Sequence, residues 1–98
     1  MESALHAQIA RRERVIQELK RILVENLHVP LPAEAIDLDA ALFGTGLGLD
    51  SVDALELVVA TETRFRVALP EGELRGALRT VNALTDLVLA LERTEETA

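Results

Sequence analysis

The chain has 98 residues, no cysteine and a net charge of −7. This length gives room for one small domain, and the lack of cysteine excludes both a disulfide framework and a thiolate metal site. Hydrophobic residues make up 49% of the chain, which is too many for a disordered protein. No apolar run is long enough to cross a bilayer. We therefore expect one globular domain over residues 1–98, without stable membrane insertion.

The charged residues are unevenly distributed along the chain. The N-terminal arginines follow the first apolar residues, which is the wrong order for a secretory signal, so a cytoplasmic location is expected. No Lys or Arg occurs between Arg21 and Arg64, whereas eight acidic residues lie there. Such a segment repels nucleic acid and attracts basic protein surfaces, although a solvated acidic face explains the same pattern. No nucleic-acid partner is expected.

The first predicted element is a long amphipathic helix from about Ser3 to Leu27. This stretch contains no Gly or Pro, and its apolar residues recur at helical spacing. Its first part, residues 1–13, is expected to extend beyond the core, which we place at about residues 14–91. Pro30 and Pro32 cannot continue the helix. A long connection follows, in which DLDAALF predicts a single helical turn.

Three further helices are predicted after this connection, which runs from about residue 28 to residue 50. The second helix is expected over 51–66, with Asp50 as its N-cap and Asp53 at the capping-box position. A short third helix is expected over 73–79. The fourth begins near Thr80 or Asn82, and residues 92–98 form a frayed tail. The predicted fold is all-α: a small bundle of three main helices and one short helix, with a long loop between the first two.

The stretch LFGTGLGLDS, residues 42–51, places three glycines before a helix start, a pattern that often binds phosphate. A P-loop needs a lysine and a dinucleotide site needs a parallel sheet, and this context has neither. A hydrolase serine needs flanking glycines and a histidine base. His6 and His28 have no evident way to meet Ser51, so both are expected on the surface. We expect no catalytic residue and no metal site.

A serine at a helix start, after a flexible loop, suits either of two interpretations. It is accessible to an enzyme, and the helix dipole favours an attached phosphate there. Alternatively, Ser51 is only an N-cap. The next helix, SVDALELVVATETRF, is apolar over most of its circumference, so it is either buried or offered in part to a partner. Val52 and Val59 stand seven residues apart on one side, beside acidic residues, and core and partner contact both remain open for them.

The segment LFGTGLGLDSVDALELVVATETRFRVALPEGEL, with ILVENLHV before it and TVNALTDLV after it, resembles the acyl carrier protein family. The resemblance covers about residues 14–91. It implies that Ser51, preceded by Asp50, carries 4′-phosphopantetheine through a phosphodiester. A separate phosphopantetheinyl transferase would install this arm from coenzyme A, and the terminal thiol would hold acyl groups as thioesters. The sulfur of this chemistry would therefore come from the cofactor.

The resemblance also implies further roles. The recognition helix would present Val52, Asp53, Glu56, Val59 and Glu62 to partner enzymes. These partners would be acyltransferases, ligases or ketosynthase-type enzymes with basic docking surfaces. The acyl chain would lie among aliphatic side chains between helices, with Leu47, Leu55, Val58 and Leu78 as candidate lining residues. The protein itself would be a monomeric, non-catalytic carrier in fatty acid, polyketide or related specialised lipid biosynthesis.

Some residues depart from the family pattern. Val52 stands where the family usually has Leu, and Arg64 and Arg66 weaken the negative patch at the end of the recognition helix. These departures favour a specialised-pathway carrier, such as one for aryl polyene or unusual lipid synthesis, over the general housekeeping type. Two other classes stay open: a peptidyl or aryl carrier, and a helical interaction domain that is never modified.

Overall fold

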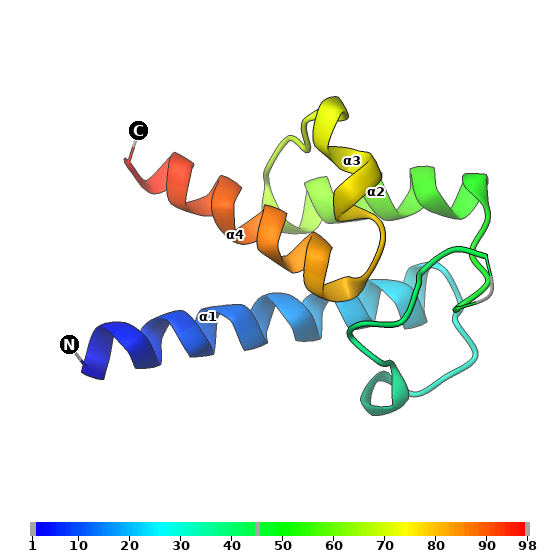
Figure 1. Cartoon of the computed structure of the whole chain (residues 1–98), viewed down its shortest axis with the longest axis horizontal. Coiled ribbons are helices and arrows are strands. Elements are labelled where there is room, and N and C mark those ends of the chain that lie inside the picture. The colour runs from blue at the N-terminus through cyan, green and yellow to red at the C-terminus, as the bar shows by residue number, and fades with distance from the viewer. Residues whose placement is uncertain (1, 45, 98) are drawn as a thin grey trace.

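The computed structural model describes residues 2–44 and 46–97, with the side chains of residues 4–44 and 46–92. It contains four α-helices and, in this part of the chain, no strand (Figure 1). Their bounds are α1 Glu2–Arg21, α2 Ser51–Phe65, α3 Glu71–Ala77 and α4 Val81–Thr97. The predicted all-α bundle of three main helices and one short helix is confirmed. Both termini lie at one end of the molecule, and the long loop lies at the other (Figure 1).

The first helix ends in a wider turn than the sequence predicted. After α1, residues Ile22–Asn26 form one turn of π-helix, η1, in which the Leu27 N–H donates to the Ile22 carbonyl oxygen at 3.2 Å. Helical structure therefore spans residues 2–26, close to the expected extent. His28 then adopts a left-handed conformation with φ of 58°, and Pro30 prevents a return to helix.

One aliphatic core holds the helices together. α1 packs along α4, and η1 packs against α2. The largest fully buried side chains come from all four of these elements and include Leu19, Ile22, Leu57 and Leu84. Burial of one such side chain stabilises the fold by about 1.5–3 kcal/mol. The residues at positions 4–10 of α1 are all exposed, so this helix starts beyond the core.

The long loop is tied to the bundle by its backbone and by apolar anchors. Its only regular element in the described residues is the 3₁₀ turn η2, Ala33–Ala35, which begins after Pro32. Within residues 37–43, where a single helical turn was predicted, one hydrogen-bonded turn is present, in which the Ala40 N–H donates to the Asp37 carbonyl oxygen at 3.2 Å, but it does not extend into a helix. Leu42 is buried, and its N–H donates to the carbonyl oxygen of Arg79 at 3.0 Å. The loop thus lies across the connection between α3 and α4.

The two C-terminal helices differ from their predicted bounds. α3 begins at Glu71, two residues early, because Pro70 serves as its N-cap residue with extended backbone. α4 begins at Val81, as expected, and the Thr80 hydroxyl accepts the Ala83 N–H at 3.0 Å. α4 continues to Thr97, through residues where fraying was predicted, because ERTEET contains neither Gly nor Pro.

Candidate functional site

The start of α2 places a serine hydroxyl in solvent. Asp50 is the N-cap residue: its carboxylate accepts the Asp53 N–H at 2.9 Å, and the Asp53 carboxylate accepts the Asp50 N–H at 3.0 Å. This confirms the predicted capping box. Ser51 is the first helical residue and is exposed. The interpretation of Ser51 as the N-cap is therefore wrong, and its hydroxyl makes no hydrogen bond within residues 2–44 and 46–97.

The residues at this helix start fit a phosphodiester on Ser51. The helix dipole presents partial positive charge at its N-terminus, which favours an anionic group there. The capping box occupies the N–H groups of Asp50 and Asp53 but leaves the Ser51 oxygen accessible. Esterification would therefore break none of the hydrogen bonds that start the helix.

The glycine-rich loop fixes the chain just before this site. Gly44 and Gly48 have φ of 74° and 75°, a conformation that L side chains rarely adopt. At Gly46, an added Cβ would lie only 1.7 Å from the carbonyl oxygen of Ala41. The loop folds back on itself there, since the N–H of the next residue, Leu47, donates to that same oxygen at 2.9 Å. After this close approach, the side chain of Leu49 is buried in the core, whereas Asp50 of the capping box is at the surface.

Three apolar side chains form an exposed stripe along α2. Val52, Leu55 and Val59 are 72%, 67% and 53% exposed, and their spacing places them on one helix face. Glu56, also exposed, stands beside them. The interpretation of the two valines as core residues is therefore wrong. The stripe also contains Leu55, which we had expected to line an acyl-chain site.

The far end of α2 is engaged within the molecule. The Glu62 carboxylate accepts the Leu69 N–H at 2.7 Å and so fixes the turn towards α3. Arg64 forms an ion pair with Glu18 of α1, and this hydrogen-bonded guanidinium holds the pKa of the Glu18 carboxyl below its ordinary value. Glu62 and Arg64 therefore have structural partners, whereas Glu56 is exposed on the same helix as the stripe.

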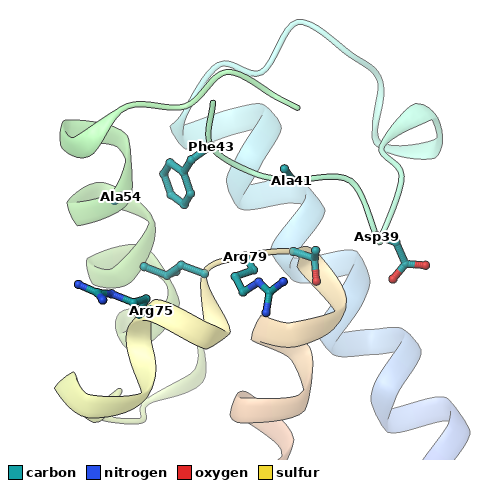
Figure 2. Close-up of a pocket in the computed structure, with 8 residues that line it drawn as sticks. Asp39, Ala41, Phe43, Ala54, Arg75 and Arg79 are labelled. Atoms are coloured by element: carbon teal, nitrogen blue, oxygen red, sulfur yellow. The ribbon is translucent and has the colours of Figure 1, made fainter. Parts of the chain in front are cut away.

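A cavity of about 530 Å³ lies beside α2, between the long loop and α3 (Figure 2). Its lining residues are Asp39, Ala41, Phe43, Ala54, Arg75, Leu78, Arg79 and Thr80. Among the four predicted lining residues, only Leu78 belongs to this set; Leu47 and Val58 are half-buried elsewhere. Sequence reasoning missed Ala54, although its position three residues after Ser51 places both on one side of the helix.

The described residues contain neither a metal-binding cluster nor a membrane-spanning helix. No group of three or more His, Cys, Asp or Glu residues there is arranged to hold a metal ion. None of the helices described has the length and the apolar character that crossing a membrane requires.

Comparison with known proteins gives a consistent result. The family model for the phosphopantetheine attachment site matches residues 17–88. An acyl carrier protein of Campylobacter fetus subsp. fetus is 37% identical over 59 residues, which cover 60% of this chain and 73% of that protein. An acyl carrier protein of Campylobacter hominis is 36% identical over 59 residues, covering 60% of this chain and 71% of that protein. The family match includes the capping box, Ser51 and the cavity.

Proposed function

Because this chain belongs to the phosphopantetheine-binding family of acyl carrier proteins, with 4′-phosphopantetheine as its covalent cofactor, we propose that Ser51 is the attachment residue. The observation that carries this proposal is the exposed Ser51 hydroxyl at the first position of α2. In the transfer, Ser51 Oγ forms a bond to the phosphorus that bears pantetheine and loses its proton. The adenosine bisphosphate part of coenzyme A leaves.

In this proposal the protein is a carrier and not a catalyst. The thiol of the arm, when bound, holds acyl groups as thioesters for other enzymes. The work of this chain is to present the arm at a capped helix start and to offer the loaded group to its partners. The pathway would be fatty acid, polyketide or related specialised lipid biosynthesis, and the proposal keeps the expected cytoplasmic location and monomeric state.

The exposed stripe of α2 is the proposed docking surface for partner enzymes. Val52 and Val59 would enter apolar depressions, and Glu56 would meet basic groups of the partner. Phosphopantetheinyl transferase, acyltransferase or ligase, and ketosynthase-type enzymes would share this surface. Asp53 and Glu62 lie on the same helix and would add to its acidic character, although each carboxylate also accepts a backbone N–H.

Mass spectrometry tests the attachment residue directly. The unmodified protein is incubated with coenzyme A and a broad-specificity phosphopantetheinyl transferase, and the intact mass is measured. We expect a gain of one phosphopantetheine in the wild type and in Thr63→Ala, which removes another exposed hydroxyl from α2. Ser51→Ala should gain nothing while keeping the wild-type circular dichroism spectrum. An equal gain in Ser51→Ala, or no gain in the wild type, would refute the proposal.

A further inference from the structure

Two arginines without a hydrogen-bond or ion-pair partner among the described residues line the cavity beside α2. Arg75 lies in the last turn of α3 and Arg79 in the connection to α4, and both line the cavity. No hydrogen bond or ion pair joins either guanidinium to the described residues, although Glu71 stands four positions before Arg75. Among the other arginines, four form ion pairs with carboxylates, namely Arg11, Arg12, Arg21 and Arg64. Arg14 and Arg66 have no such partner among the described residues, but neither lines the cavity. Positive charge at this cavity is therefore left for a group from outside the chain.

The carboxylate in the cavity wall is already engaged. Asp39 accepts a hydrogen bond from the Asn82 side chain at 2.7 Å, and the oxygen of that amide accepts one from Arg12 at 3.0 Å. Arg12 thereby orients Asn82 and places positive charge near Asp39. Asp39 makes no ion pair with Arg75 or Arg79, so its charge does not neutralise the two guanidiniums.

The cavity is apolar near α2 and basic on the side of α3. Figure 2 shows Phe43 and Ala54 on the side where α2 begins, and Arg75 and Arg79 on the side of α3. Leu78 lies between the two arginines in sequence and is half-buried. A group that enters from Ser51 therefore meets apolar surface first and guanidinium groups farther on. The volume of about 530 Å³ lies within the range of small-molecule sites.

We propose that Arg75 and Arg79 select acyl groups that carry a carboxylate remote from the thioester, such as the half-thioester of a dicarboxylic acid. The methylene chain lies against Phe43, Ala54 and Leu78, and the carboxylate receives hydrogen bonds from the guanidinium groups. Guanidinium binds carboxylate in a planar, bidentate geometry, which makes it the suitable side chain for this task. This inference rests on the proposed function, since the load reaches the cavity only on an arm attached near it.

The test compares two loads of equal length on the same protein. The transferase is given octanoyl-coenzyme A or its carboxyheptanoyl counterpart, which ends in a carboxylate. Wild type is compared with Arg75→Gln/Arg79→Gln and with a control, Arg14→Gln/Arg66→Gln, which removes two exposed arginines that do not line the cavity. The readouts are the rate of spontaneous thioester hydrolysis at pH 7 and the amide NMR shifts of Ala54 and Leu78.

We expect the wild type to hydrolyse the carboxyheptanoyl thioester about three- to tenfold more slowly than the Arg75/Arg79 variant, the scale of one ordinary net hydrogen bond, because both guanidinium groups belong to exposed residues. The octanoyl thioester should hydrolyse at the same rate in both, and the control variant should match the wild type. Equal changes for both loads would overturn the inference. The inference would also be overturned if the amide NMR shifts of Ala54 and Leu78 had already changed fully in the protein with an unloaded arm. The anion bound by the arginines would then be the phosphodiester of the arm. Failure of any load to attach would refute the proposed function instead.

Discussion

Two regions of the molecule are held by different forces. At the loop end, backbone hydrogen bonds, the close approach at Gly46 and the capping box fix the chain around Ser51. Away from the loop end, the middle of α1 meets α4 through ion pairs, Arg12 to Asp86 at 2.6 Å and Arg11 to Glu92 at 3.4 Å. Steric contact and backbone hydrogen bonds define positions narrowly, whereas ion pairs that remain partly exposed are weaker and are screened by salt. Ser51, the proposed attachment residue, is thus held in the more narrowly defined region.

Gly46→Ala should lower the unfolding free energy most, because the new side chain would collide with the backbone of the loop. The added methyl would meet the Ala41 carbonyl oxygen at 1.7 Å, so the loop must open and release the buried Leu49. We expect a loss of about 2 kcal/mol or more in unfolding free energy, measured by urea denaturation. The rate of phosphopantetheine attachment should fall as well, since the capping box follows Leu49.

Gly76→Ala is the matched control for this change. Gly76 lies inside α3, and an added Cβ there has no heavy atom within 4 Å. Alanine favours the helix over glycine, so the variant should gain about 0.5–1 kcal/mol in unfolding free energy. If both alanine variants lost stability equally, the close approach at Gly46 would not be what holds the loop.

The sequence predicted those parts of the fold that depend on local chemistry. Helical spacing, Pro30 and the Asp50–Asp53 pair act between residues close in the chain, so the helices and the capping box were predicted correctly. The cavity depends on Phe43, Ala54 and Arg75, which come from three segments and meet only in the folded chain. Its lining could not be predicted from spacing, and Leu55 was named as a lining residue because the resemblance implies that aliphatic side chains between helices hold the acyl chain.

The ion pairs between α1 and α4 also could not be predicted from residues close in the sequence. The sequence showed an arginine-rich start and an acidic middle region, but not which carboxylates the arginines meet. In the structure, Arg11 and Arg12 pair with Glu92 and Asp86 of α4, outside that region. The packing of α1 along α4 decides this pairing, and it is set by buried apolar residues such as Leu19 and Val88.

Asp50→Ala should have an intermediate effect at the loop end. It removes the acceptor for the Asp53 N–H and leaves the first turn of α2 without its cap. Loss of an N-cap acceptor costs about 1 kcal/mol. Asp50→Asn keeps a side-chain oxygen as the acceptor, so its unfolding free energy, measured by urea denaturation, should fall by only about 0.3 kcal/mol. Equal losses in the two variants would mean that the charge of Asp50, and not its hydrogen bond, starts the helix.

Glu18→Gln should have the smallest effect and should depend on pH. The Arg64 guanidinium holds the pKa of Glu18 below its ordinary value of 4.5, so the folded state binds this proton less readily than the unfolded state. The stabilisation is therefore complete above that ordinary value and is lost as the pH falls through the lowered one. Because the pair is partly exposed, we expect the variant to be less stable by about 0.5 kcal/mol at pH 7 and equal to the wild type at low pH. Glu13→Gln, at an exposed site on the same helix without an ion pair among the described residues, should show no such difference. A gap between Glu18→Gln and wild type that persists in acid would show that the side chain stabilises α1 by packing, and that its charge contributes nothing.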